Sequence, residues 1–407
     1  MGKTLFFFTS SFPFGKGETF IENEIKFLVQ NFEKVVIVSN DISSRQTRHV
    51  AENVTLLRTT YELGFFRKIF SFRNVFSRLF WQEIKLIKNV YNRRLSLPIL
   101  NTILQTQEKG NVLGAQVEKM IEEYSGTKDS IYLYSYWTND MAFVISKLRA
   151  KNNRYKAFSR MHRWDIYFEE NKVNYLPFRT YIFSNLNTVF SISNDGINYT
   201  EKLLRLKDLG ISLSRLGVLK RVGNPKGDKS LLEVVSVSNM ISVKNISTLI
   251  EGLQLLKLDF HWTHIGDGPL KNELEEKAER MIPGKFEFKG AMPNIEVMNF
   301  FSNNAIDIFI NVSLSEGVPV SIMEAMSFGI PCIATSVGGN PEIINRSNGL
   351  ILPSRATAID ISNALISFHK LTKEEQLEMS SQAYKTWAEE YNATKNYTQF
   401  VVDILSL

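Results

Sequence analysis

The chain has 407 residues, which is too long for one hydrophobic core of ordinary size, so two domains are expected. Its 44% hydrophobic residues, 22% charged residues and net charge of +6 suit a globular enzyme and exclude a disordered chain. The sequence contains no run of about 18 apolar residues that could cross a bilayer. Its first residues lack a signal-peptide cleavage pattern. The single cysteine, Cys332, lies in an apolar run and is expected to be a buried thiol.

Short β-branched or aromatic runs alternate with helical patterns, which is typical of β-α units around a mostly parallel sheet. In the first half the expected strands are 5–9, 35–38, 54–57, 131–134, 157–160 and 188–192, and helical patterns cover 21–31 and 117–124. In the second half the expected strands are 232–237, 260–265, 286–288, 306–310, 332–334 and 349–352. From residue 373 onward the pattern is helical, with no further strand.

The fold class expected from this alternation of strands and helices is α/β, with two Rossmann-like domains facing across a cleft. The first domain would cover 1–219, the polar and turn-rich residues 220–229 would form a hinge, and the second domain would cover 230–380. A C-terminal helix in 381–407 would pack back on the first domain. Ligands of open α/β sheets bind outside the carboxyl ends of the strands, so the site should lie there.

Residues 59–94 combine an excess of cations with interleaved aromatic residues. The only carboxylates are Glu62 and Glu83, against Arg67, Lys68, Arg73, Arg78, Lys85, Lys88, Arg93 and Arg94. This composition fits peripheral association with an anionic membrane surface. An amphipathic helical insertion whose aromatic residues pack on their own domain fits equally well, and both interpretations stay open. No nucleic-acid-binding module accompanies the charge, so nucleic acid is not expected as a partner.

The turn after the expected strand 306–310 has the properties of an anion site. Helical spacing begins after Pro319, a residue favoured at the start of a helix. The first helical amides, including those of Val320 and Ser321, have no partner within the helix and lie at its positive dipole end, which suits a diphosphate. Gly317 allows the backbone to approach such a group closely.

Two carboxylates, Glu316 and Glu324, flank this turn. A carboxylate would repel phosphate but accepts hydrogen bonds from hydroxyl groups. Glu316 is therefore expected to face a sugar and Glu324 a ribose. A glutamate near a helix start can also simply cap its own helix.

Residues 316–324, continued by Ser327-Phe328-Gly329-Ile330-Pro331 and Val337-Gly338-Gly339-Asn340-Pro341-Glu342, resemble the E-x7-E signature of the retaining GT-B glycosyltransferase family. This family builds bacterial surface polysaccharides and glycolipids, and the resemblance covers about 234–349. It implies that Glu316 contacts the donor sugar, Glu324 the nucleotide ribose, and the amides of Val320 and Ser321 the diphosphate. It also implies that the first domain binds the acceptor, that the second binds the nucleotide-sugar, and that transfer retains the anomeric configuration.

The stretch from Val237 to Lys244 is similar to a loop in which this family uses an arginine and then a lysine to neutralise the diphosphate. Lys244 matches the lysine, whereas Asn239 stands where the arginine is expected. A neutral amide supplies no charge. Either Lys220, Arg221 or Arg163 substitutes for the arginine, or the donor binds weakly.

Further resemblances come from loops in both halves. Gly266 and Gly268 resemble the glycine-rich turn beside the cleft, and Gly290 and Met292 lie in a stretch that resembles the strand end whose backbone contacts the base. In the first half, His162 resembles a histidine that faces the donor sugar.

The loop after the first strand carries Gly15 and Gly17, which would allow its backbone to approach the donor phosphates or the acceptor. The cluster Tyr134-Ser135-Tyr136-Trp137 is expected in the core rather than as an acceptor platform.

The sequence lacks an Asp-x-Asp and a G-x-G-x-x-G motif, and His261 and His264 would face opposite sides of a strand. No metal or other cofactor is therefore expected, and cations and amides would stabilise the leaving diphosphate. The resulting hypothesis is a cytoplasmic glycosyltransferase that acts on a saccharide or a lipid-linked saccharide. A location at the inner face of the cytoplasmic membrane also fits this hypothesis. A nucleotide-sugar 2-epimerase of the same fold and a catalytically inactive assembly partner remain alternatives.

Overall fold

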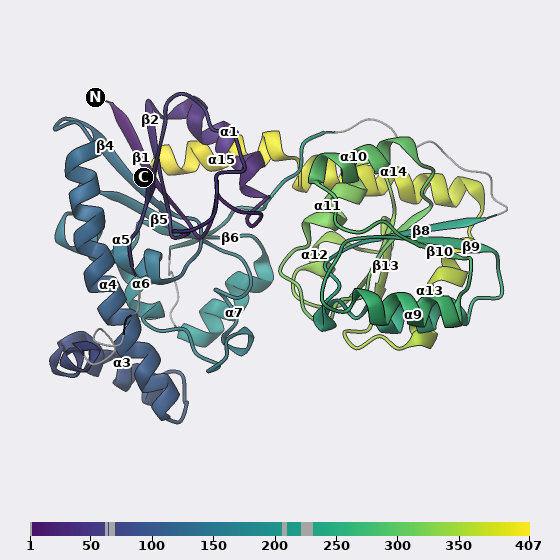
Figure 1. Ribbon diagram of the computed structural model, residues 1–407, viewed down its shortest axis with the longest axis horizontal. Coiled ribbons are helices and arrows are strands. Elements are labelled where there is room, and N and C mark those ends of the chain that lie inside the picture. The colour runs from purple at the N-terminus through teal and green to yellow at the C-terminus, as the bar shows by residue number, and fades with distance from the viewer. Residues whose placement is uncertain (1, 62–63, 65–69, 206–209, 221–230) are drawn as a thin grey trace. The chain divides into compact units, whose positions relative to one another are not determined.

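A computed structural model describes residues 2–61, 64, 70–205, 210–220 and 231–407 (Figure 1). The chain divides into two compact units, one made of Met1–Ser214 with Tyr397–Leu407 and the other of Arg215–Asn396. Apart from Lys220, the hinge expected at 220–229 lies outside the described residues.

The first unit is built on a seven-stranded parallel sheet with the order β3-β2-β1-β4-β5-β6-β7. Its strands are β1 (Lys3–Thr9), β2 (Lys34–Ser39), β3 (Val54–Arg58), β4 (Ser130–Ser135), β5 (Lys156–Met161), β6 (Thr188–Ser191) and β7 (Ile211–Leu213). The strand order reverses between β1 and β4, which is the arrangement of a Rossmann-like domain. Parallel strands buried on both faces need continuous apolar sequence, and Phe6, Phe7 and Phe8 of β1 are all buried.

Helices cover both faces of this sheet (Figure 1). They are α1 (Ile21–Asn31), η1 (Ser71–Phe76), α3 (Arg78–Asn89), α4 (Leu97–Tyr124), α5 (Asp140–Lys151), η2 (Phe168–Glu170), α6 (Arg179–Asn185) and α7 (Asn194–Leu204). Successive residues of a strand point to opposite faces. Phe6 and Phe8 accordingly pack in the cluster containing α4 and α5, while Leu5 and Phe7 pack in the cluster containing α1.

A buried ion pair lies beside the cluster that contains Leu5 and Phe7. Glu24 of α1 and Arg160 of β5 pair with both side chains fully buried, and the Tyr134 hydroxyl donates to Glu24 over 2.8 Å. The guanidinium of Arg160 also lies 4.1 Å from the ring centroid of Phe400, in the C-terminal helix α15 (Ala393–Leu405). Phe400, Val401 and other residues of α15 therefore complete the core of the first unit.

The second unit has a six-stranded parallel sheet with the order β10-β9-β8-β11-β12-β13. Its strands are β8 (Leu232–Val237), β9 (Phe260–Ile265), β10 (Phe286–Phe288), β11 (Ile308–Asn311), β12 (Cys332–Thr335) and β13 (Gly349–Leu352). The order reverses between β8 and β11, so this unit is also Rossmann-like. Cys332 is fully buried in β12, which confirms the expected buried thiol.

The remaining helices belong to the second unit. They are η3 (Ser242–Lys244), α8 (Ile246–Gln254), α9 (Lys271–Met281), α10 (Asn294–Asn303), α11 (Val320–Ser327), α12 (Asn340–Ile343), α13 (Ala358–His369) and α14 (Lys373–Glu390). Together the two sheets bear out the expected α/β fold with two Rossmann-like domains.

Candidate active site

The candidate site of the second unit lies at the point where its strand order reverses. Strands β8 and β11 are parallel neighbours, so the loops that follow them leave the same edge of the sheet. The amide of Leu314, after β11, donates to the carbonyl of Val243, after β8, over 2.8 Å. This edge is where ligands bind in doubly wound sheets.

Glu316 and Lys244 meet across these two loops. The ammonium of Lys244 donates to Glu316 Oε1 over 2.6 Å, and the side chains of Asn311 and Ser313 donate to the same oxygen over 3.2 and 2.6 Å. Glu316 is only 7% exposed, so its carboxylate is fixed by donors rather than directed into bulk water. The sequence predicted Glu316 and Lys244 but not Asn311 and Ser313. The only feature that could have indicated these two was a small polar side chain at, or just after, the end of β11.

The loop that carries Glu316 rests directly on a glycine. Gly338 has φ of +51°, and a Cβ atom there would lie 1.9 Å from the carbonyl oxygen of Glu316. The amide of Gly339 donates to the carbonyl of Gly317 over 2.6 Å. Only glycine permits this contact, which holds Gly317 against the turn between β12 and α12.

Helix α11 starts after this loop, as the sequence predicted. Pro319 precedes Val320 and Ser321 of its first turn, and no side chain caps this helix within the described chain. Amides of a first helical turn that lack a side-chain cap remain available to an anion.

Glu324 lies one turn further along α11 and is also 7% exposed. Its Oε1 accepts a hydrogen bond from the side chain of Asn294, the first residue of α10, over 2.6 Å. Glu324 therefore does not cap the start of its own helix through this oxygen. Asn294 was missed by sequence reasoning because an asparagine after a turn is common.

The glycines after β9 and β10 gather beside the loop that contains Asn239. The amide of Gly266 donates to the carbonyl of Gly290 over 2.9 Å. A Cβ atom on Gly266 would lie 1.8 Å from the carbonyl oxygen of Ser238, and one on Gly268 would lie 2.5 Å from that of Met240. These contacts place the predicted glycine-rich turn next to the loop after β8.

A buried histidine supports the same loop. His264 Nε2 donates to the carbonyl of Ser238 over 3.1 Å, and Nδ1 accepts from the hydroxyl of Ser236 over 2.8 Å. Burial lowers the pKa of His264 to about 4, so the imidazole is neutral near pH 7.

The side chains of the two remaining predicted positions have different surroundings. Asn239 is exposed and Met292 is half-buried. Of the cations proposed to replace the missing arginine, Arg163 pairs with Glu170 over 2.8 Å, Lys220 is exposed, and Arg221 lies outside the described residues.

His162 directly follows strand β5 in the first unit and is buried. Its ring centroid lies 4.6 Å from that of Tyr136 and 4.5 Å from that of Trp137. Neither ring nitrogen has a hydrogen-bond partner among the described residues, and Nδ1 lies 3.8 Å from Asp165 Oδ2. Burial by itself raises the pKa of Asp165, but the neighbouring His162 and Arg179 favour its ionised form and hold the pKa below its usual value.

The first loop of this unit, which contains Gly15 and Gly17, is organised by a carboxylate that sequence reasoning missed. Glu18 accepts hydrogen bonds from the amides of Ser11 and Phe12 over 2.6 and 2.7 Å and from Trp137 Nε1 over 2.5 Å. The amide of Gly15 donates to the carbonyl of Arg45 over 3.0 Å, whereas Gly17 is exposed.

The aromatic cluster beside this loop is mostly core, as predicted. Tyr134 and Tyr136 are fully buried, and only Trp137 is half-buried.

The structure thus groups the predicted residues in two places. Glu316, Lys244, the start of α11, Glu324 and the glycine-rich turn belong to the second unit, and His162 and the first loop belong to the first unit.

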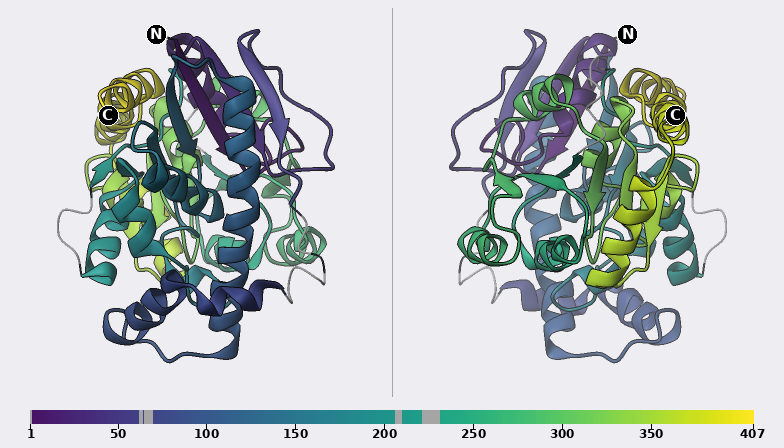
Figure 2. Two further views of the ribbon diagram at one scale, coloured as in Figure 1. Left: turned by 90° about the vertical axis from the view of Figure 1, so that its left-hand side faces the viewer. Right: turned by 90° about the vertical axis from the view of Figure 1, so that its right-hand side faces the viewer.

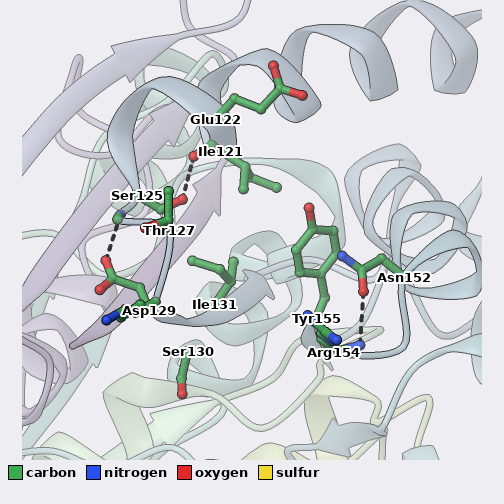
Figure 3. A pocket seen from close by; sticks show the side chains of 12 residues that line it. Ile121, Glu122, Ser125, Thr127, Asp129, Ser130, Ile131, Asn152, Arg154 and Tyr155 are labelled. Atoms are coloured by element: carbon green, nitrogen blue, oxygen red, sulfur yellow. Dashed lines mark hydrogen bonds between the residues drawn. The ribbon is translucent and has the colours of Figure 1, made fainter. Parts of the chain in front are cut away.

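A cavity of about 590 Å³ opens elsewhere, at the amino ends of β4 and β5 in the first unit (Figure 3). Its lining includes Ser125, Asp129, Asn152, Arg154 and Tyr155, and none of the predicted site residues. This edge is opposite to the one at which doubly wound sheets bind ligands, so the cavity is not a candidate for the site.

The described residues contain neither a candidate membrane span nor a candidate metal-binding cluster. None of the helices in this part of the chain combines the length and hydropathy needed to cross a membrane. Nor does the described part bring three or more His, Cys, Asp or Glu side chains together in a way that could hold a metal ion.

Comparison with known proteins points to one family for the second unit. Residues 221–386 match the family model described as glycosyl transferases group 1. A teichuronic acid biosynthesis glycosyltransferase, TuaC of Bacillus subtilis (strain 168), is 28% identical over 46% of this chain and 47% of its own length. A colanic acid biosynthesis glycosyltransferase, WcaL of Escherichia coli (strain K12), is 26% identical over 59% and 61%. The chain therefore matches about half the length of these relatives.

Solved structures resemble the whole chain. The apo form of the lipopolysaccharide outer core galactosyltransferase WaaB has a TM-score of 0.68 at 17% identity, covering 98% of this chain and 99% of its own. Anabaena Alr3699/HepE in complex with UDP and glucose has a TM-score of 0.67 at 14% identity, with full coverage of both chains. This chain therefore has the GT-B fold, and its residues 221–386 are similar to the group 1 glycosyltransferases.

Proposed function

We propose that this protein is a glycosyltransferase that moves a sugar from a nucleotide-sugar donor to an acceptor hydroxyl. The observation that carries the proposal is the contact between Lys244 and Glu316 at the start of α11, at the edge of the sheet where ligands bind. A cation, a carboxylate and uncapped helix amides at one point suit the junction of a pyrophosphate and a sugar.

Each group has a role that its chemistry allows. Lys244 has three N–H donors, and the one that reaches Glu316 leaves the others for phosphate oxygens. The amides of Val320 and Ser321 add donors for the same diphosphate. The free oxygen of Glu316 accepts from sugar hydroxyls, and Glu324 with Asn294 binds the ribose.

In the proposed reaction the bond between the anomeric carbon and the diphosphate oxygen breaks, and the acceptor oxygen forms the new bond as its hydroxyl proton passes to an oxygen of the leaving diphosphate. Negative charge grows on the leaving diphosphate. Donors already held in place next to that charge provide the largest share of the rate enhancement. Lys244 and the α11 amides fill this role without a metal or other cofactor.

The finer assignments extend this proposal. The acceptor is a saccharide or lipid-linked saccharide in surface polysaccharide or glycolipid biosynthesis, a class supported by the names of TuaC and WcaL. Transfer occurs in the cytoplasm with retention of configuration. Asn239, exposed where a relative would carry arginine, favours a catalytically inactive assembly partner as the second candidate.

Calorimetric titration with UDP-, GDP- and ADP-glucose tests the donor site. We expect one of these donors to bind, and Glu324→Ala to weaken its binding about ten- to a hundredfold, because charged hydrogen bonds to the ribose are lost. Glu273→Ala, which removes an exposed glutamate of α9, is the matched control and should bind like the wild type.

Other results of these experiments would contradict the proposal or identify a different function. Absence of binding to every donor would contradict the proposal and favour the assembly partner. Conversion of the donor to its C2 epimer without an acceptor would identify a 2-epimerase. Unchanged affinity of Glu324→Ala would remove Glu324 from the ribose site. The anomeric configuration of the product, measured by NMR, tests retention.

A further inference from the structure

Large apolar side chains are exposed at one end of the first unit. Five of them fall within residues 70–97: Phe70 at 59% exposure, Phe72 at 66%, Phe76 at 91%, Trp81 at 54% and Leu97 at 81%. Isolated exposed apolar residues are normal on a protein surface, whereas a concentration of them marks an interaction site.

The outer face of α3 adds cations to this region. Arg78, Trp81, Lys85 and Lys88 recur at helical spacing and are all exposed. The opposite face is already occupied, because Phe80, Ile84 and Ile87 are buried in the core of the unit. The cationic face of α3 is therefore directed to solvent while the helix itself is held in place.

No exposed carboxylate from this segment balances the cations. Glu83 is the only acidic residue between 70 and 97, and it is buried, where the amide of Phe178 donates to it over 2.6 Å. Arg73 and Arg93 pair with Glu108 and Glu169 from other elements. Within the described part of the chain, none of the other four cations forms an ion pair: Arg78, Lys85, Lys88 and Arg94.

Hydrogen bonds to α4 hold the segment that carries the exposed aromatic residues. Ser77 caps α3 by accepting from the amide of Phe80 over 3.1 Å, and Gln107 of α4 donates to the same hydroxyl over 2.7 Å. Asn74 of η1 donates to Glu108 of α4 over 3.2 Å. In both views of Figure 2, η1 and α3, in dark blue, lie together at one end of α4.

We propose that this surface, defined by Phe70, Phe72, Phe76, Arg78, Trp81, Lys85, Lys88, Arg94 and Leu97, docks the protein on an anionic lipid bilayer. Phenylalanine, tryptophan and leucine side chains enter the headgroup region, and lysine and arginine side chains attract anionic lipids. A surface that combines both kinds of side chain, without exposed carboxylates of its own, is complementary to such a bilayer. The proposal does not depend on donor binding by the second unit.

Co-sedimentation of the full chain with lipid vesicles tests the proposal. Vesicles of phosphatidylcholine with about 30% phosphatidylglycerol should bind the protein, and vesicles of phosphatidylcholine alone should bind it at least tenfold more weakly. The triple variant Arg78→Gln/Lys85→Gln/Lys88→Gln should lose about fivefold in partition coefficient for each cation at low ionic strength. The matched control, Lys370→Gln/Lys373→Gln/Lys385→Gln, removes three exposed lysines of the second unit and should bind like the wild type.

A second variant separates insertion from charge attraction. Phe72→Ser/Phe76→Ser keeps every cation and should still lose at least tenfold in binding, including at about 0.5 M salt, where the charge contribution is screened. Ile359→Ser, at another exposed apolar residue, is its control. Thermal unfolding and nucleotide titration of each variant verify that the fold and the donor site are intact.

Three results would overturn the proposal. These are wild-type protein that stays in solution with anionic vesicles, binding that neither variant reduces, and binding that an RNA or DNA oligonucleotide abolishes through the same cations.

Discussion

At the scale of single residues, the structure adds hydrogen-bond partners of the two site carboxylates that the sequence could not predict. The carboxylates of Glu316 and Glu324 were predictable as a pair because their spacing around Pro319 is distinctive. Their partners were not, because Asn311, Ser313 and Asn294 become informative only when folding brings them together. The roles assigned to these residues remain predictions.

The buried Glu83 makes stability depend on pH. Burial raises its pKa from 4.5 to about 7, against the opposing effect of hydrogen bonds from Tyr175 and Phe178. Below pH 4.5 the carboxyl is protonated in the folded and unfolded states, so its contribution to stability is fully present. As the pH rises through about 7, the folded state keeps a proton that the unfolded state has released, and that stability is lost.

We therefore expect the free energy of unfolding to fall by about 3 kcal/mol between pH 4.5 and 7, and this fall to be absent in Glu83→Gln. Urea unfolding at several pH values measures it. Glu52→Gln, at an exposed glutamate, should retain the wild-type profile. Parallel profiles for the wild type and Glu83→Gln would contradict the assignment.

At the scale of elements, the strands were easier to predict than the helices. The expected strand 232–237 coincides with β8, because a parallel strand buried on both faces reads as an apolar run. The short edge strand β7 was missed, since it is only partly buried. Helix α4 begins at Leu97, well before the expected 117, because Gly110 interrupts the helical pattern. A Cβ atom there would lie 2.6 Å from the ring of Phe143, so this glycine permits close packing of α4 on α5.

The turn that supports Glu316 gives a prediction at this scale. Gly338→Ala should displace the loop and lower the free energy of unfolding by at least about 2 kcal/mol, because the new methyl group meets a backbone carbonyl. It should also abolish donor binding in the calorimetric titration. Gly284 also has positive φ but nothing within 4 Å of an added Cβ, so Gly284→Ala isolates the backbone strain, at about 1 kcal/mol. Equal effects of both variants would contradict the proposed contact.

At the scale of the whole molecule, the repeated β-α pattern predicted a mostly parallel sheet, and each unit has a parallel sheet whose strand order the pattern did not give. The sequence predicted a C-terminal helix that packs back on the first domain, but it could not show where that helix docks. Helix α15 begins in the second unit, and its residues from Tyr397 onward belong to the first. Phe400 packs there against Tyr134, Phe158 and Phe190.

Phe400→Ala should lower the free energy of unfolding by about 3–5 kcal/mol, because it leaves a cavity beside the buried Arg160. Val402→Ala is the matched control on the same helix. Val402 is 55% exposed, so its truncation should change stability by less than about 0.5 kcal/mol. Chemical unfolding of both variants provides the comparison, and a similar loss in both would show that α15 does not support the core.

Because the polypeptide leaves the first unit after Ser214 and re-enters it at Tyr397, the second unit is an internal insertion in the sequence of the first. A gene fragment that stops before residue 397 encodes an incomplete first unit. An exchange of the whole second unit between related genes would therefore replace residues 215–396 as one segment and leave the final codons with their original first unit.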